Sequence, residues 1–470
     1  MRRFLPLAAL LAVAGCGATM SAGVTTGGAQ DIGLARNQLA AGRLPSPESF
    51  VVEGLLKEHD IDVPAEPCAA RFCLNSAVGV APALDTGRED AFLVLGFSSG
   101  IDLATFRRRP LNLAVVVDRS GSMSGGKIAA ARTALHKLLN QLGPQDRLSL
   151  IVFDDQVDVV LPATELTDGT EPLHPLIDEI VERGSTDIES ALAEGYRQLL
   201  SGRSEGREDR VMLLTDAQPN TGRTDQGSFI ELARAYADQG IGLTVFGVGL
   251  DYGQELTLAI SKTPGASFFY LETDARLAQV FDQDFDLLVT PVAWDFDLHV
   301  DPAPGYRIVA AYGVPSWVDD AGQGGVNVHI PTLFLSKNRG AIVLRMEPEG
   351  GRFSDVLGSS SLAYRERRAE ARHETRETLR LDAPAAGSDG VRTAVALCNT
   401  ALGLKHAARL ARDGQPREAA ALLDDVDALI ASGPFDEERR LVQSLRGLIG
   451  QVSERPLAER PHAEEGRWIR

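Results

Sequence analysis

The chain has 470 residues, of which 44% are hydrophobic and 24% charged, a composition ordinary for a globular protein with room for about two to four domains. This composition excludes collagen, a coiled coil and wholesale disorder. The 47 Lys and Arg residues against 65 Asp and Glu residues give a formal net charge of −18. Because nucleic acids are bound through clustered positive charge, we do not expect this chain to bind them.

The N-terminus has the organisation of a bacterial export signal. Two arginines follow Met1, and an apolar stretch runs from Phe4 to Val13. That stretch is too short to cross the roughly 30 Å hydrocarbon core of a bilayer as a helix. Its end, Val13-Ala14-Gly15-Cys16, resembles the lipobox of bacterial lipoproteins. The resemblance implies a signal peptide over residues 1–15 and a lipid on Cys16; the alternative is an ordinary signal peptide with an incidental cysteine.

A lipid on Cys16 would anchor the protein in the bacterial cell envelope. Each buried acyl methylene contributes about 0.8 kcal/mol, so two or three chains would hold the protein on a membrane durably. Gly17 lacks the acidic residue that retains some lipoproteins at the inner membrane, which favours the outer membrane. Residues 16–30 are rich in Gly, Ala, Ser and Thr and are expected to form a flexible tether.

Three further cysteines follow. Cys68 and Cys73 are close enough in sequence to form a disulfide in an oxidising envelope. They could instead be metal ligands, although no second cysteine pair or nearby histidine accompanies them. Cys398 lies in an apolar helical pattern, so we expect it to be a small buried hydrophobic residue.

Residues 31–109 mix a short helical pattern over 50–57 with an apolar strand from Ala91 to Phe97, which indicates a β-rich region. From 110 to 290 apolar strands alternate with amphipathic helices. Strands are predicted at 111–117, 147–153, 211–215 and 243–248, and helices at 128–142, 171–182, 187–200 and 226–239. This alternation predicts a doubly wound parallel sheet with helices on both faces, in which ligands bind at the carboxyl ends of the strands.

Oxygen-bearing side chains gather at that predicted edge. Asp118 follows the first strand and Asp216 follows the strand at 211–215. Ser120 and Ser122 lie in a tight turn beside Asp118, and Thr186 lies in the loop before a predicted helix. Taken singly, each of these residues is more often a helix cap or a turn former than a ligand.

Together, the pattern Asp118-x-Ser120-x-Ser122 with Thr186 and Asp216 resembles the metal-ion-dependent adhesion site of von Willebrand factor type A (vWA) domains. The resemblance covers 110–290. It implies that the hydroxyls bind Mg²⁺ (or Mn²⁺ or Ca²⁺) directly, that the carboxylates bind partly through water, and that an acidic residue of a partner protein completes the coordination. Ala217 stands where the family usually has Gly, and Arg119 fills a variable position. Neither departure removes a ligand oxygen.

Residues 291–385 are predicted to be β-rich, beginning with the alternating segment VAWDFDLHV. The charged stretch 362–382 is ambiguous between a hairpin and a helix, and its alternating leucines favour the hairpin. Residues 36–63 also resemble the region that precedes the vWA domain in some bacterial envelope proteins. We therefore expect a β-sandwich built from both sides of an inserted vWA domain.

The chain turns helical at 386–452 and ends in a polar tail at 453–470. Gly and Pro breakers separate three predicted helices at 391–412, 416–431 and 435–452.

These patterns predict a lipid-anchored envelope protein that binds a partner protein through a divalent cation and is not an enzyme. Its eight histidines are scattered, and no nucleophile elbow or phosphate-binding loop follows a strand. One rival is a metal-dependent hydrolase, in which Asp118 and Asp216 act beside a metal-bound water. The other is a structural scaffold that binds through its sandwich or its helical end.

Overall fold

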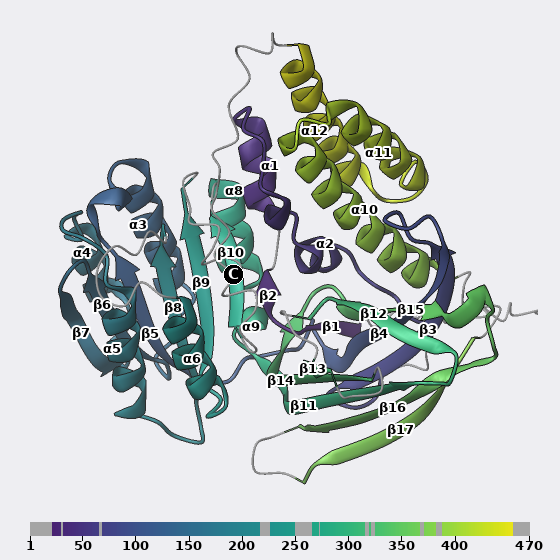
Figure 1. The fold of residues 1–470 in the computed structure, drawn as a ribbon. Coiled ribbons are helices and arrows are strands. Elements are labelled where there is room, and N and C mark those ends of the chain that lie inside the picture. Colours follow the sequence, from purple (N-terminus) through teal and green to yellow (C-terminus); the bar gives the residue numbers. More distant parts are fainter. Residues whose placement is uncertain are drawn as a thin grey trace, which may run out of the picture.

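The computed structural model describes residues 21–29, 32–64, 68–216, 226–249, 266–271, 273–314, 319–320, 325–366, 371–381 and 388–454. The expected signal peptide, Cys16, Ala217 and the tail beyond residue 454 lie outside these residues. An α/β unit, an antiparallel sheet and a helical bundle lie beside one another (Figure 1).

The α/β unit is built on a sheet of order β2-β10-β9-β8-β5-β6-β7. Its strands are β2 (Gly28–Ala29), β5 (Leu111–Asp118), β6 (Arg147–Phe153), β7 (Val157–Glu165), β8 (Glu208–Thr215), β9 (Gly242–Val248) and β10 (Ala266–Leu271). Neighbouring strands are parallel except β7, which is antiparallel to β6. The predicted doubly wound parallel sheet is confirmed; the antiparallel edge strand β7 was not predicted.

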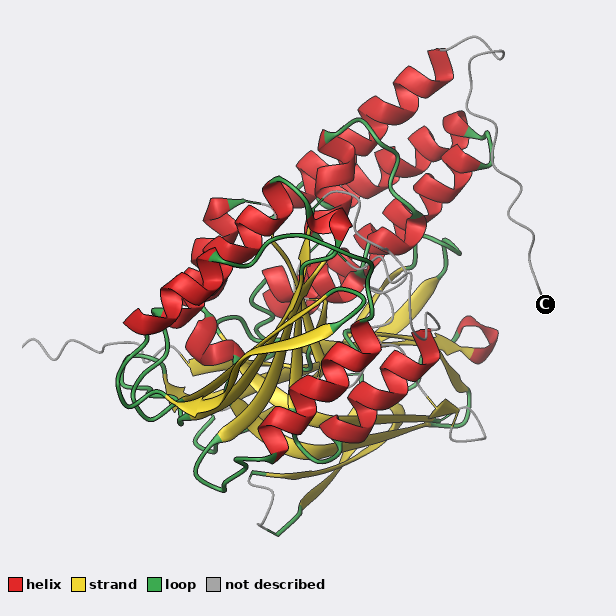
Figure 2. Cartoon of the chain, turned by 90° about the vertical axis from the view of Figure 1, so that its left-hand side faces the viewer, coloured by secondary structure: helices red, strands yellow, loops and turns green. Residues whose placement is uncertain are grey.

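Helices cover both faces of this parallel sheet (Figure 2). They are α3 (Gly126–Leu139), α4 (His174–Asp178), α5 (Ile188–Leu200), α6 (Gln226–Ala237), α8 (Asp274–Leu277) and α9 (Phe285–Leu288), with a π-helical segment η4 (Ala278–Gln283) before α9. Along β5, Leu113 and Val115 pack in the core that contains α3, whereas Ala114 and Val116 pack in the core that contains α5. Both faces of β5 are therefore buried, which explains its largely apolar sequence.

The second sheet is antiparallel, with the order β12-β15-β4-β1-β14-β11-β16-β17; β3 pairs with β4 and β13 with β14. Its strands are β1 (Ser21–Thr25), β3 (Cys73–Pro82), β4 (Glu89–Asp102), β11 (Pro291–Pro302), β12 (Tyr306–Tyr312), β13 (Asp319–Asp320), β14 (Val326–Ser336), β15 (Ala341–Pro348), β16 (Val356–Arg365) and β17 (His373–Arg380). As predicted, segments from both sides of the α/β unit build one β structure.

This antiparallel sheet folds over on itself as a sandwich does. Phe97 of β4 and Phe296 of β11 are separated by two strands in the sheet order, yet their ring centroids lie 5.7 Å apart. The hairpin predicted within 362–382 is confirmed, because β16 pairs with β17 and brings Leu362 opposite Thr375.

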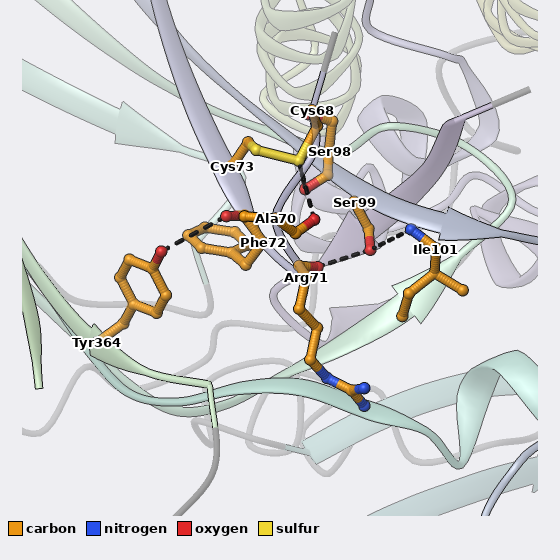
Figure 3. Close-up of a disulfide and its surroundings, with 9 residues drawn as sticks. All are labelled: Cys68, Ala70, Arg71, Phe72, Cys73, Ser98, Ser99, Ile101 and Tyr364. Carbon is orange, nitrogen blue, oxygen red and sulfur yellow. Dashed lines mark hydrogen bonds between the residues drawn. A yellow bond between two sulfur atoms is a disulfide. The ribbon is translucent and has the colours of Figure 1, made fainter. Parts of the chain in front are cut away.

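A disulfide closes the loop that leads into β3. Cys68 is bonded to Cys73, the pair expected from their spacing (Figure 3). The Ser99 hydroxyl of β4 donates a hydrogen bond to the Arg71 carbonyl oxygen at 2.6 Å. The Phe72 ring packs against those of Phe97, Phe296 and Tyr364. The loop therefore lies against β4 and contributes to the sandwich core.

The segment 21–29 corrects the flexible tether expected over 16–30. Its first half, β1, lies in the middle of the antiparallel sheet between β4 and β14. Its second half, β2, pairs with β10 at the edge of the parallel sheet. Ala22 and Val24 are fully buried. A segment of nine residues thus belongs to both sheets and links them.

Close packing, and not flexibility, explains two glycines of the segment 21–29. A Cβ atom added at Gly23 would lie 1.9 Å from the Asn338 carbonyl oxygen. One added at Gly27, where φ is +82°, would lie 2.4 Å from the Ala266 carbonyl oxygen. Only glycine fits at these two positions, so the composition that favours a flexible linker here reflects tight contact with neighbouring strands.

The C-terminal helices α10 (Asp389–Arg412), α11 (Pro416–Leu429) and α12 (Asp436–Glu454) confirm the three predicted helices. They share a core with α1 (Gly33–Ala40), which was not predicted, and α2 (Val52–Glu58). Cys398 is buried there as a free thiol, and burial raises its pKa above the ordinary value. Among the helices that the structure describes, none is both long enough and apolar enough to cross a membrane.

Candidate metal site

Three neighbouring strands of the parallel sheet each end in a buried carboxylate. In the strand order β8-β5-β6, Asp216 follows β8, Asp118 ends β5 and Asp154 follows β6. Asp118 and Asp216 are 0% exposed and Asp154 is 1% exposed. Because the carboxyl ends of parallel strands lie at one edge, the three carboxylates lie at the same rim. Asp154 was not predicted, although it follows its strand as Asp118 does.

Asp118 is held by one donor from the loop that follows β5 and one from the neighbouring strand β8. The Ser120 amide donates to Asp118 Oδ1 at 2.9 Å. The Thr215 hydroxyl donates to Asp118 Oδ2 at 2.6 Å. The pairing of Val117 with Leu214 places Asp118 beside Thr215, so the sheet register creates this second bond.

A chain of hydroxyl contacts joins Asp118's loop to Asp216. Ser120 Oγ lies 3.0 Å from Ser122 Oγ. The Ser122 hydroxyl in turn donates to Asp216 Oδ1 at 3.0 Å. A short 3-10 turn over Gly121–Met123 produces this arrangement. The structure thus brings four of the five predicted ligands into contact.

Thr186, the fifth predicted ligand, is fully buried on an adjacent loop. Two backbone hydrogen bonds hold that loop against the serine loop. The Gly121 amide donates to the Gly184 carbonyl oxygen at 3.1 Å, and the Arg183 amide donates to the Arg119 carbonyl oxygen at 2.6 Å. Thr186 follows this contact by two residues, so its loop belongs to the same rim.

Lys127, which was not predicted, also contacts the candidate ligands. It is the second residue of α3, and its Nζ donates to Asp216 Oδ2 at 2.7 Å. Both oxygens of Asp216 therefore have donors, one from Ser122 and one from Lys127. Lys127 lies in the first turn of the helix that follows the serine loop, but the sequence does not show the path of its side chain.

The rim's chemistry fits a hard divalent cation. Burial raises the pKa of Asp118 to about 6, and the charge of Asp216 adds to the rise, although hydrogen bonds from Thr215 and Ser120 oppose it. A cation would favour the ionised form that burial disfavours. No three His, Cys, Asp or Glu side chains converge as ligands within the described ranges. A cation held here would need the hydroxyls as further donors, and such an all-oxygen set would suit Mg²⁺, Mn²⁺ or Ca²⁺.

Asp154 joins three loops of the rim. Its Oδ2 accepts hydrogen bonds from Arg119 Nε at 2.8 Å and Arg183 Nε at 2.6 Å. Its Oδ1 accepts from the Gln156 amide at 2.9 Å. Burial alone raises the pKa of Asp154, but the bonds from Arg183, Gln156 and Arg119 outweigh it and lower the pKa below its ordinary value. Asp154 is therefore ionised at neutral pH and holds the loops of Arg119 and Arg183 together.

We expect the substitution Asp154→Ala to reduce the free energy of unfolding by about 3 kcal/mol, because it leaves the Arg119 side chain, 11% exposed, without its buried partner. The control is Asp158→Ala. Asp158 contacts the same two arginines but is 49% exposed, so its loss should cost less than about 1 kcal/mol. Urea denaturation of both variants measures the difference, and equal losses would contradict a special role for Asp154.

Residues 112–283 match the family model described as von Willebrand factor type A domain. The uncharacterised protein sll0103 of Synechocystis sp. is 30% identical over 179 residues, which are 38% of this chain and 42% of that protein. The uncharacterised protein YfbK of Escherichia coli (strain K12) is 26% identical over 335 residues, which are 67% of this chain and 57% of that protein. The chain thus spans between 42% and 57% of the length of these two relatives.

Human inter-alpha-trypsin inhibitor heavy chain H4 is 30% identical over 207 residues, which are 40% of this chain and 21% of that protein. Among solved structures, the von Willebrand factor type A protein from Catenulispora acidiphila superposes with a TM-score of 0.53 at 14% identity. That superposition covers 81% of this chain and 91% of the other. The likeness of fold therefore extends beyond the α/β unit into the antiparallel sheet.

Proposed function

Because residues 112–283 of this chain form a von Willebrand factor type A domain, we propose that the protein binds a partner protein through a divalent cation held at the rim of the parallel sheet. The proposed ligands are Asp118, Ser120, Ser122, Thr186 and Asp216, and the proposed cation is Mg²⁺, with Mn²⁺ or Ca²⁺ as substitutes. The main support is the unbroken run of contacts from Asp118 through the two serines to Asp216.

In the proposed site, the hydroxyls bond the cation directly and the carboxylates balance its charge. The three hydroxyls are neutral donors, and the two buried carboxylates supply the opposing charge. A bound cation would supply an electrophilic coordination position for a carboxylate oxygen of the partner. An acidic side chain of the partner is therefore the recognised group.

We propose further that the protein is not an enzyme. Ser120 and Thr215 donate to Asp118, and Ser122 and Lys127 donate to Asp216. With Asp118 and Asp216 also committed to the proposed cation, neither carboxylate would be left as a free general base. This arrangement argues against the metal-dependent hydrolase that the sequence left open.

The resemblance of residues 13–16 to a lipobox supports a lipid anchor on Cys16. We propose that this anchor attaches the protein to the cell envelope at the outer membrane. Metabolic labelling with a radioactive fatty acid would test it: wild type should incorporate label and Cys16→Ala should not.

We expect Asp118→Ala to lower Mg²⁺ affinity at least about 100-fold, because even residues that only orient ligands change affinity by about 10–100-fold. Isothermal titration of Mg²⁺ into the protein that begins at Gly17 measures this loss. Asp168→Ala, which removes an exposed carboxylate on the turn after β7, is the control and should bind as wild type does.

Two outcomes would refute the proposed function. Wild-type protein that is folded yet takes up neither Mg²⁺ nor Mn²⁺ would remove the metal site. Hydrolysis of esters or phosphoesters by wild type that is lost in Asp216→Ala would favour the hydrolase instead.

A further inference from the structure

Lys127 places a positive charge inside the candidate metal site. Its side chain is 19% exposed, whereas the Asp216 side chain that it contacts is 0% exposed. The ammonium therefore points into the rim and not out to solvent. The two other cations near the rim, Arg119 and Arg183, are paired with Asp154 and Asp158 and contact none of the five proposed ligands in the described hydrogen bonds.

Gly249, which follows β9, fixes the path of the Lys127 side chain. A Cβ atom added at Gly249 would lie 2.4 Å from Lys127 Cε and 2.9 Å from its Cδ. Gly249 has a φ of +92°, a conformation that other residues rarely adopt. The Tyr270 hydroxyl donates to the Gly249 carbonyl oxygen at 2.6 Å and holds this backbone in place. The aliphatic part of the Lys127 side chain therefore packs against Gly249, where any larger residue would clash with it.

The charge of the rim depends on this lysine. When Asp118 and Asp216 are ionised and Lys127 is protonated, these three side chains carry one net negative charge. A divalent cation would change it to one net positive charge, and a single carboxylate would then neutralise the site. Without Lys127, the same cation would already leave the site neutral and less attractive to an acid.

We propose that Lys127 sets the affinity and the charge of this site: it weakens the binding of the divalent cation and gives the occupied site a net positive charge that favours one carboxylate of the partner. The inference rests on the proposed function. Two positive charges a few ångströms apart repel each other, and the repulsion is stronger in a buried rim than in bulk water. Lys127 thus exchanges cation affinity for affinity toward an anion.

The first test is the titration of Mg²⁺ into folded wild type, Lys127→Met and Lys137→Met. Lys127→Met should bind Mg²⁺ about tenfold more tightly, as expected when a like charge is removed from a partly hydrated site. Lys137 lies on the same helix but pairs with Asp282, so Lys137→Met should bind as wild type does. Lys127→Arg keeps the charge and should retain nearly wild-type affinity. If Lys127→Met does not fold, Lys127→Gln gives the same neutral charge.

The second test measures the anion. Acetate is titrated into the Mn²⁺-loaded proteins and its binding is followed by water-proton relaxation. Lys127→Met should need about tenfold more acetate than wild type for the same change. If wild type and Lys127→Met bound Mg²⁺ equally well and also bound acetate equally well, only the proposed role of Lys127 would be overturned. Failure of every variant to take up a cation would overturn the metal site as well.

Discussion

A protein that begins at Gly17 is expected to fold, whereas one that begins at Asp31 is expected to be insoluble or unfolded. The shorter protein lacks β1, a strand between β4 and β14, and β2 at the edge of the parallel sheet. Loss of buried Val24 alone removes about 1.5–3 kcal/mol. Each lost backbone hydrogen bond removes about 0.5–1.5 kcal/mol more, against a total stability of about 5–15 kcal/mol.

Circular dichroism and size-exclusion chromatography would compare the two proteins. Within the longer protein, Val24→Ser should lower the melting temperature clearly, because it places a hydroxyl at a fully buried position. Leu429→Ser is the matched control: Leu429 is 37% exposed on α11, and its substitution should change stability by less than about 0.5 kcal/mol. A soluble protein beginning at Asp31 that melts like the longer one would show that β1 is dispensable.

Substitution of Lys57 by methionine is expected to stabilise the protein at pH 7. Lys57 Nζ is buried in α2 and has no hydrogen-bond partner among the described residues. Burial lowers the pKa of Lys57 to about 7, and the nearby charge of Glu53 opposes this shift only in part. The buried, unpaired ammonium therefore destabilises the folded state at every pH at which Lys57 is protonated. Methionine fills similar space without a charge.

The same pKa shift predicts how stability changes with pH. Below pH 7 the amine is protonated in both states, and the penalty is fully present. From pH 7 to the unfolded value of 10.5, the unfolded state binds a proton that the folded state does not, so the free energy of unfolding rises with pH. The rise is on the order of 3 to 5 kcal/mol across this interval. Lys57→Met carries no such charge, so at pH 7 it should already be as stable as wild type is at the upper end of this interval.

Urea denaturation at several pH values between 7 and 10 measures this effect. The stability difference between Lys57→Met and wild type should be largest at pH 7 and shrink as the pH rises. Lys337→Met, which removes a half-exposed lysine paired with Asp284, should show no such convergence. If the difference in free energy of unfolding between Lys57→Met and wild type stayed constant across this range, the pKa of Lys57 would not be lowered by burial.

The sequence predicted most of the α/β unit because its central strands are buried on both faces and are therefore largely apolar. Asp118 and Asp216 could be placed together without a structure, since each follows an apolar run. Thr215 and Lys127 could not, because their contacts depend on the sheet register and on the path of a side chain over Gly249. Asp154 could also have been predicted, because it directly follows an apolar strand as Asp118 does.

Other differences have local causes. The helix predicted over 171–182 is shorter, a 3-10 turn at Glu171–Leu173 followed by α4, which ends at Asp178. The chain must then turn to bring the Thr186 loop against the serine loop. Strand β7 was missed because it is a half-exposed edge strand that contains a proline, and so lacks the apolar run of its neighbours.

The segment shared by the two sheets has a mechanical consequence if Cys16 carries a lipid. The chain between Cys16 and Ser21 spans at most about 18 Å when fully extended, so the folded body would stand close to the membrane. Tension between the membrane and a bound partner would enter the body at β1, where two strand ladders share the force.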